Sequence, residues 1–428
     1  MSVKLALFGG RKAINKTFKK YNSFSNEEVE AAKKVVESGV LSEYLARDHK
    51  DFYGGKKVLE FERQCKLYFK VKHAITFNSW TSGLISAVGA IGTEPGDEII
   101  VSPWTMAASA TAILHWNAIP VFADIDKETF CLDPSSVERN ISSQTKAILS
   151  VDIAGQSADV DALNNLAKKY NLKIISDSAQ APGAKVNNKF VGTATDIGGF
   201  SLNYHKHIHT GEGGVAVTND DFLAERMRLI RNHGEVVVSE RNTENIVNMI
   251  GHNFRLGEIE CAIGIEQLKK LENRVLSRQK IAKKFDDCFK NLKGLNPPKV
   301  RTNCSHVYYT YCMTVDESVT GVSRDIIYKA LISEGVPLSK KYDNIHLLDL
   351  YQKKIAYGSK GFPWTSDICK RDISYEKGIC PNAETLNEKS FLGFGICSFE
   401  LENIDVKMIL EAFQKVWDNL DKLKNYVD

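Results

Sequence analysis

The 428-residue sequence has no long uninterrupted apolar run. Residues 1–11 are apolar only over Leu5–Phe8, which is too short for the apolar core of a signal peptide. No stretch elsewhere is long enough to span a bilayer. We therefore expect a cytoplasmic protein with neither a targeting segment nor a membrane span.

The sequence also lacks paired cysteines. Nine cysteines are scattered from Cys65 to Cys397, and none forms a CxxC pair. This distribution favours neither a zinc ribbon nor a disulfide framework. Reduced thiols in a cytoplasmic protein are the simplest interpretation.

An excess of charge of one sign is missing as well. The 56 basic and 53 acidic residues give a formal net charge of +3, and both signs are interspersed along the chain. This balance gives no electrostatic case for binding nucleic acid or an acidic membrane surface.

Short apolar runs alternate with helical stretches from about residue 74 onward. Residues 97–102, 118–123, 145–151 and 173–176 have the composition of buried strands, and residues 159–170 carry apolar side chains at helical spacing. This alternation predicts βαβ units and a mainly parallel sheet.

The composition changes after Gly294, where two prolines interrupt the chain. Residues 307–315 then alternate like a strand, and residues 324–334 have a helical pattern. We predict a large α/β domain with an N-terminal segment over residues 1–275 and a smaller α+β domain over residues 276–428.

The segment that carries most chemical information is Phe200–Gly214, FSLNYHKHIHTGEGG. Lys206 lies five residues before its Gly-Glu-Gly-Gly turn, and an upstream apolar run ends near Asp177. Open α/β sheets bind ligands beyond the carboxyl ends of their strands. An aspartate there can face a cofactor ring nitrogen, a partner that pyridoxal 5'-phosphate (PLP) requires.

With these residues the sequence resembles the DegT/DnrJ/EryC1/StrS family of sugar aminotransferases, from about Glu60 to Gly264 and more weakly to Pro381. The family's lysine motif is S-F-x-x-x-K-x-[IL]-x-x-G-E-G-G, and this chain departs from it only at Leu202. The resemblance implies a fold-type I PLP-dependent transferase, with a large, mainly parallel-sheet α/β domain and a smaller C-terminal α+β domain. It also implies that Lys206 carries the cofactor as a Schiff base.

The resemblance implies further cofactor contacts. Asp177 matches the acidic residue that pairs with the pyridine nitrogen, and Gln180 matches a residue near the phenolic oxygen. Ser201 matches a serine whose hydroxyl reaches the phosphate. Thr81 and Ser82 match a turn that offers backbone N–H groups to the phosphate at a helix N-terminus.

Two positions depart from the family pattern. Trp80 stands where the family usually has glycine in the phosphate-binding turn. The family usually has an aromatic residue after a threonine, to cover the cofactor ring, whereas Thr105 is followed by Met106. Either Met106 covers the ring or Trp104 swings in, and the sequence leaves both open.

Asn253 lies in the segment Gly-His-Asn-Phe-Arg. It matches an asparagine that reaches the phosphate of the neighbouring subunit. The resemblance therefore implies a homodimer with shared active sites.

Three alternating histidines, His205, His207 and His209, would share one face of an extended backbone and could form a metal cluster. No acidic or thiol ligand has a fitting spacing, and the lysine motif already accounts for the segment. We therefore predict no metal site. A contact of one imidazole with the phosphate or substrate stays open, but we expect these histidines to be packed or solvent-facing.

The sequence thus predicts a PLP-dependent aminotransferase that moves an amino group from glutamate or glutamine to a keto sugar. Nucleotide-linked keto sugars are the commonest acceptors in the family, and keto-inositols and keto-octulosonates remain open. We expect residues 39–57 and 342–380 to determine the acceptor.

Two other functions remain as alternatives. One is a PLP- or pyridoxamine-phosphate-dependent sugar dehydratase, whose relatives carry histidine in place of the lysine. The other is a non-catalytic sensory or regulatory protein on the same scaffold. Lys206 argues against the first, and the retained pair of Lys206 and Asp177 argues against the second.

Overall fold

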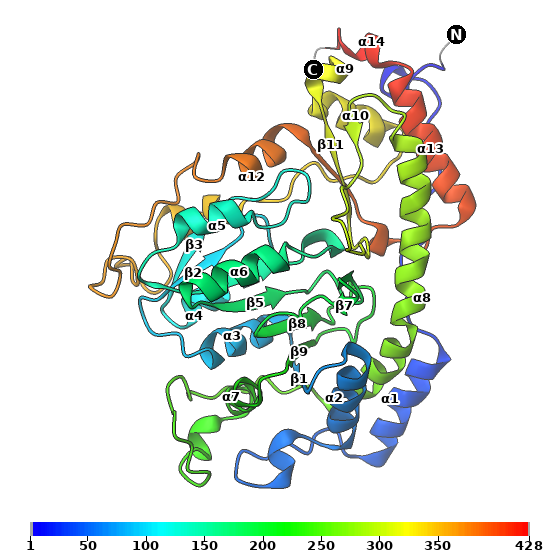
Figure 1. Ribbon diagram of the computed structural model, residues 1–428. Coiled ribbons are helices and arrows are strands. Elements are labelled where there is room, and N and C mark those ends of the chain that lie inside the picture. Colours follow the sequence, from blue (N-terminus) through cyan, green and yellow to red (C-terminus); the bar gives the residue numbers. More distant parts are fainter. Residues whose placement is uncertain (1–2, 427–428) are drawn as a thin grey trace.

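The computed structural model describes residues 3–426, and a seven-stranded sheet forms its centre (Figure 1). The strand order is β1-β9-β8-β5-β4-β2-β3. Strand β9 runs antiparallel to both neighbours, and the other adjacent pairs are parallel. The predicted α/β class with a mainly parallel sheet is confirmed. The strands are β1 (His73–Phe77), β2 (Glu98–Val101), β3 (Ile119–Phe122), β4 (Thr145–Val151), β5 (Lys173–Asp177), β8 (Ile197–Ser201) and β9 (Gly214–Thr218).

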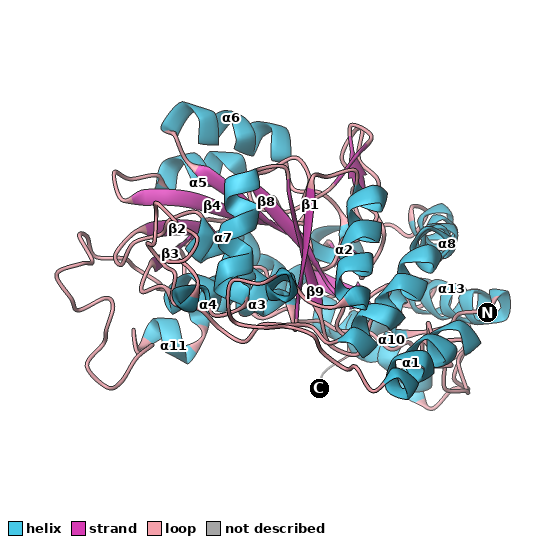
Figure 2. Ribbon diagram, turned by 90° about the horizontal axis from the view of Figure 1, so that it is seen from below, coloured by secondary structure: helices cyan, strands magenta, loops and turns pink. Residues whose placement is uncertain are grey.

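Helices cover both faces of this sheet. Figure 2 shows α5 and α6 on one side of the strands and α3 and α4 on the other. Every residue of β2, β3, β8 and β9 is buried, which explains why these strands are continuous apolar runs without alternation. The helices of this unit are α1 (Asn26–Ser38), α2 (Lys56–Phe69), α3 (Trp80–Ala90), α4 (Ala108–His115), α5 (Pro134–Asn140), α6 (Val160–Tyr170) and α7 (Asp221–Arg231).

A smaller unit contains the antiparallel sheet β10-β11-β12. The long helix α8 (Glu258–Phe289) extends from α1 and α2 toward this unit and α13 (Figure 1). The other elements here are β10 (Leu295–Asn296), β11 (Tyr311–Val315), β12 (Phe391–Phe394), α9 (Glu317–Thr320), α10 (Arg324–Ser333), α13 (Asn403–Trp417) and α14 (Leu420–Leu423).

The boundary that the sequence suggests, between residues 275 and 276, falls inside α8 and stays a prediction. Leu5, Ile14 and Phe18 pack in the apolar cluster of the smaller unit, together with the C-terminal end of α8. The N-terminal segment therefore contacts a part of the protein that is distant in sequence.

Residues 342–380 form a packed strap. The strap includes α11 (Asp349–Gln352) and runs to α12 (Pro381–Thr385). Tyr375 is buried and its hydroxyl donates to the carbonyl of Pro120 in β3 at 2.7 Å. Arg371 donates from Nε and Nη2 to the two carboxylate oxygens of Glu98 in β2, at 2.7 and 2.8 Å. Irregularly spaced aromatic side chains anchor the strap, so its sequence shows no periodic pattern.

The remaining strands, β6 (Lys185–Val186) and β7 (Lys189–Phe190), form a small hairpin. Among residues 3–426 no helix combines the length and the apolar character needed to cross a membrane.

Substituting Tyr375→Phe should destabilise the protein by about 1–3 kcal/mol, because two buried partners lose the hydroxyl. These partners are the carbonyl of Pro120 and the indole N–H of Trp364, which donates to that hydroxyl at 2.9 Å. Chemical denaturation measures the change. Tyr170→Phe is the matched control, since the Tyr170 hydroxyl donates to Glu138 at the surface. An equal effect of both substitutions would contradict a structural role for the strap contact.

Candidate functional site

A cavity of about 190 Å³ opens at the carboxyl ends of β1, β4, β5 and β8. Because parallel strands present these ends at one edge of the sheet, residues that follow different strands meet there. Six of the nine site residues predicted from the sequence line this cavity: Thr81, Met106, Asp177, Gln180, Ser201 and Lys206. Ser82, Trp104 and Asn253 do not.

Asp177, the last residue of β5, is only 5% exposed. Its Oδ1 accepts hydrogen bonds from the indole Nε1 of Trp80 at 2.9 Å and from the backbone N–H of Ala179 at 3.2 Å. Its Oδ2 accepts from the hydroxyl of Ser109 at 2.7 Å. These donors stabilise a buried negative charge that would otherwise be costly.

Lys206 lies on the turn after β8 and is 7% exposed. Its Nζ is 4.5 Å from the ring centroid of Tyr309. Burial lowers the pKa of this amine to about 8, and the negative charge of Asp177 opposes that shift. About a tenth of the amine is therefore neutral at pH 7, far more than for an ordinary lysine, and only the neutral amine is a nucleophile.

The turn that carries Lys206 is closed by backbone hydrogen bonds. Leu202 donates to the carbonyl of Gly213 at 2.9 Å, and Thr210 donates to the carbonyl of Leu202 at 3.0 Å. Gly211 and Gly213 have φ angles of +88° and +148°, in a region that side chains disfavour. The glycines of the motif thus allow the chain to return into β9 directly behind the lysine.

The three histidines of this segment do not share a face. His205 lines the cavity, and burial is the main reason that its pKa falls to about 4. His207 is fully buried, with Nε2 2.8 Å from the carbonyl of Val307, and its burial lowers the pKa to about 3. His209 packs against Phe24 at 4.7 Å between ring centroids. Across residues 3–426 no three histidine, cysteine, aspartate or glutamate side chains are grouped to hold a metal ion.

The N-terminus of α3 faces the cavity beside Ser201. Ser79 caps this helix by accepting from the backbone N–H of Ser82 at 3.1 Å. The Ser82 hydroxyl donates to Asn78 Oδ1 at 2.6 Å, so it is engaged away from the cavity, whereas Thr81 lines it. The first N–H groups of a helix have no intrahelical acceptor, and together with the helix dipole they favour an anion.

Of the two residues considered for covering the ring, Met106 lies at the cavity and is 61% exposed. Trp104 is buried in the core, where it stacks on Tyr342 with ring centroids 5.5 Å apart and meets the edge of Phe391. The structure therefore does not bring Trp104 to the cavity.

Gln180 connects the cavity to the strap. Its Oε1 accepts from the backbone N–H of Ala154 at 2.8 Å, and its Nε2 donates to the hydroxyl of Tyr342 at 3.2 Å. Tyr342 is the first residue of the strap, so the strap contacts a residue of the cavity. That residues 342–380 determine the acceptor stays a prediction.

Sequence reasoning missed Ser109, Tyr309 and Tyr342 as neighbours of the site. Ser109 and Tyr309 contact Asp177 and Lys206, respectively, and Tyr342 contacts Gln180. No local motif marks any of the three, because each reaches the site through tertiary packing.

Asn253 is exposed and lies beside the loop that precedes α3. Its Oδ1 accepts from Arg255 Nε at 2.7 Å, and its carbonyl accepts from Asn78 Nδ2 at 3.4 Å. The side chain does not line this chain's own cavity, so its predicted phosphate contact depends on a second subunit.

The residues at the cavity fit PLP. A buried carboxylate suits a protonated ring nitrogen, the Lys206 amine suits the aldehyde, and the α3 N-terminus with Ser201 suits the phosphate.

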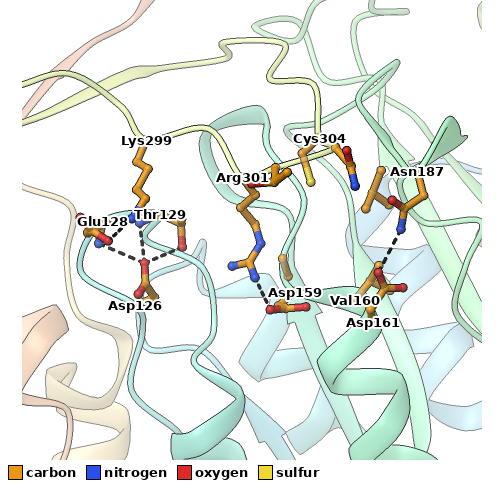
Figure 3. Close-up of a pocket in the computed structure, with 14 residues that line it drawn as sticks. Asp126, Glu128, Thr129, Asp159, Val160, Asp161, Asn187, Lys299, Arg301 and Cys304 are labelled. Carbon is orange, nitrogen blue, oxygen red and sulfur yellow. Dashed lines mark hydrogen bonds and ion pairs between the residues drawn. The ribbon is translucent and has the colours of Figure 1, made fainter.

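A larger pocket of about 400 Å³ lies elsewhere, between α6 and the loop 299–304 (Figure 3). Four of its charged side chains form ion pairs, Arg301 with Asp159 and Lys299 with Glu128. None of the predicted site residues lines it. The size of this pocket therefore does not make it the site of the chemistry.

Comparison with known proteins gives a consistent result. The model of the DegT/DnrJ/EryC1/StrS aminotransferase family matches residues 36–381. The UDP-4-amino-4,6-dideoxy-N-acetyl-beta-L-altrosamine transaminase of Helicobacter pylori is 36% identical over 303 residues, which cover 70% of this chain and 79% of that protein.

Two further similarities extend over almost the whole chain. A putative L-glutamine:3-amino-2,3-dideoxy-scyllo-inosose aminotransferase of Streptoalloteichus tenebrarius is 30% identical over 436 aligned residues, covering 99% of this chain and 100% of that protein. The X-ray structure of an aminotransferase from Psychrobacter cryohalolentis superimposes with a TM-score of 0.81 at 27% identity, covering 95% of this chain and 100% of that one.

The reactivity of Lys206 in the cofactor-free protein should rise with pH around a midpoint near 8, because only the neutral amine attacks an acylating reagent. Competitive acetylation followed by peptide mass spectrometry measures this midpoint. In Asp177→Asn the midpoint should fall, since the charge of Asp177 raises the pKa of the amine. A midpoint that stays above 10 in the unmodified protein would contradict the buried environment of Lys206.

Proposed function

Because the chain belongs to the DegT/DnrJ/EryC1/StrS aminotransferase family, it is a PLP-dependent aminotransferase of fold-type I, and we propose that its amino acceptor is a nucleotide-linked keto sugar. One observation carries the catalytic assignment: a buried amine, Lys206, and a buried carboxylate, Asp177, line the same cavity. Glutamate or glutamine is the proposed amino donor.

The proposed roles follow from the environment of each side chain. PLP, when bound, supplies an electron sink for the bond changes at the donor Cα. Asp177 would keep a proton on the ring nitrogen, because its carboxylate is buried and held by three donors. Lys206 would bond to the cofactor and, once released, carry a proton between the donor Cα and C4' of the cofactor.

The remaining contacts would bind and orient. Thr81, Ser201 and the N-terminus of α3 would hold the phosphate, and Gln180 would lie near the phenolic oxygen. Met106 would cover one face of the ring, which its position at the cavity supports.

The acceptor assignment rests on two observations. The relative from H. pylori is named for a UDP-linked amino sugar. Exposed Lys341 immediately precedes Tyr342, which contacts Gln180 at the cavity, and a lysine there would attract the diphosphate of a nucleotide sugar. The relative from S. tenebrarius is named for an inosose, so a keto-inositol is the second candidate acceptor.

We further propose that the active enzyme is a homodimer. Residues 236–250 form a segment that exposes four apolar side chains, Val236, Ile246, Val247 and Ile250, with exposed fractions of 52%, 61%, 42% and 70%. Exposed apolar surface of this kind is typical of an interface between subunits. Asn253 follows this segment closely, so its side chain would reach the partner's phosphate site.

The nine free cysteines suit a reducing compartment and support a cytoplasmic location.

Lys206→Ala should lower turnover with glutamate and a UDP-linked 4-keto sugar by a factor of about 10³ or more, because the proton carrier is lost. Coupled assays and mass spectrometry of the aminated sugar measure this loss. His205→Ala is the control and should retain turnover within about tenfold. Histidine-dependent dehydration of the sugar without amination would favour the dehydratase instead.

The acceptor is tested in the same assay by comparing the nucleotide-linked keto sugar with the free keto sugar and with a keto-inositol. We expect kcat/KM to be about 100-fold higher for the nucleotide-linked acceptor, since remote binding energy contributes to catalysis. The reverse preference for the keto-inositol would refute the nucleotide-sugar proposal and leave the aminotransferase assignment intact.

Ile250→Asp should shift the protein from dimer to monomer, because a charge would be buried in the apolar interface. Sedimentation equilibrium measures the change. Leu67→Asp, at a position on α2 that is 62% exposed, is the matched control and should leave the assembly unchanged.

Asn253→Ala should weaken PLP binding within an intact dimer. A protein that is fully active as a monomer would refute the shared site.

A further inference from the structure

Trp80 is the first residue of α3, and its indole is 3% exposed. The Nε1–H donates to Asp177 Oδ1 at 2.9 Å, across 97 residues of sequence. A glycine, the usual residue at this position in the resembling family, could not make this contact. This chain therefore has the contact because it has tryptophan where the family usually has glycine.

Two glycines provide the space for the indole. A Cβ added to Gly199 would lie 2.0 Å from Trp80 Cη2, and a Cβ added to Gly83 would lie 2.5 Å from Trp80 Cε3. Gly199 is also the residue of β8 that pairs with Asp177 in the sheet. The ring is thus confined to a narrow slot directly beside the carboxylate.

The two carboxylate oxygens of Asp177 accept different numbers of hydrogen bonds. Oδ1 accepts from Trp80 and from the backbone of Ala179, whereas Oδ2 accepts only from Ser109. A carboxylate oxygen has about two acceptor positions. Oδ1 is therefore saturated by protein donors, and Oδ2 retains one acceptor position.

We propose that Trp80 is a positioning residue that fixes the carboxylate of Asp177 so that Oδ2 meets the ring nitrogen of PLP. This inference rests on the proposed role of Asp177 as the partner of that nitrogen. The N–H group is the part of the indole that acts, because an apolar ring of similar size would fill the same slot without bonding to Oδ1. Trp80 also lines the cavity, but its effect on the ring nitrogen is exerted through Asp177.

The test compares equilibrium binding of PLP with binding of 1-deazapyridoxal 5'-phosphate, which carries C–H in place of the ring nitrogen. The cofactor-free protein is titrated with each compound, and the ratio of the two dissociation constants is measured. A residue that acts on the ring nitrogen changes this ratio, whereas a residue that only supports the fold weakens both compounds equally.

For Trp80→Phe we expect the PLP dissociation constant to rise about tenfold or more, the effect of losing a hydrogen bond to a charged group. The dissociation constant of the deaza compound should change less than about threefold. Equal changes for both compounds, or no change for either, would overturn the inference.

Two further variants control for packing effects in this comparison of PLP with the deaza compound. Trp116→Phe is the matched control, because the Trp116 indole donates to the carbonyl of Ile85 at 2.7 Å, and its loss should leave the ratio unchanged. Incorporating 3-benzothienylalanine at position 80 replaces the N–H by sulfur and preserves the ring shape, so this variant gives the same test without a packing defect. If the benzothienylalanine variant has the same ratio of dissociation constants as the unmodified protein, the inference is also overturned.

Asp177→Asn separates this inference from the proposed function. If Asp177 faces the ring nitrogen, the preference for PLP over the deaza compound falls in Asp177→Asn. An unchanged ratio there refutes the role of Asp177 itself. A reduced ratio in Asp177→Asn combined with an unchanged ratio in Trp80→Phe refutes only the role of Trp80.

Discussion

A negative charge buried at the end of β5 is the constraint on which the site depends. Asp177 is almost inaccessible, and a carboxylate in such a place is stable only when donors surround it. The donors come from α3, α4 and the turn after β5, so the positions of two helices are coupled to one side chain. The same charge acts on Lys206, whose pKa balances the penalty of burial against the attraction of Asp177. Sheet topology makes this arrangement possible, since it brings the ends of β1, β5 and β8 to one edge.

The two units of the chain share elements. Helix α8 packs on α1 and α2 at one end and belongs to the apolar cluster of the smaller unit at the other. The N-terminal segment joins that smaller cluster, and the Tyr21 hydroxyl donates to the carbonyl of His207, the residue after Lys206, at 2.6 Å. Movement of the smaller unit would therefore be transmitted to the turn that carries Lys206.

Much of the fold and the centre of the site could be predicted from the sequence, because both depend on local patterns. Buried parallel strands are continuous apolar runs, and the lysine motif combines a reactive side chain with the glycines of its own turn. The partners of these residues could not be predicted. Ser109 is 68 residues from Asp177, and Tyr342 is 162 residues from Gln180, so only the folded chain reveals these contacts. The alternation of the three histidines suggested one face, but the turn at this point directs them to three surroundings. The packing of the strap could not be predicted either, because its aromatic anchors follow no period.

The strap also has a consequence for the behaviour of the protein in concentrated solution. Strand β3 is an outer strand of the sheet, and an uncovered outer strand is a template to which a strand of another molecule can add. Pro120 has no N–H to offer such a strand, and its carbonyl is already occupied by the Tyr375 hydroxyl. The strap therefore also protects this side of the molecule from aggregation, and a chain in which the strap is shortened would expose an adhesive edge.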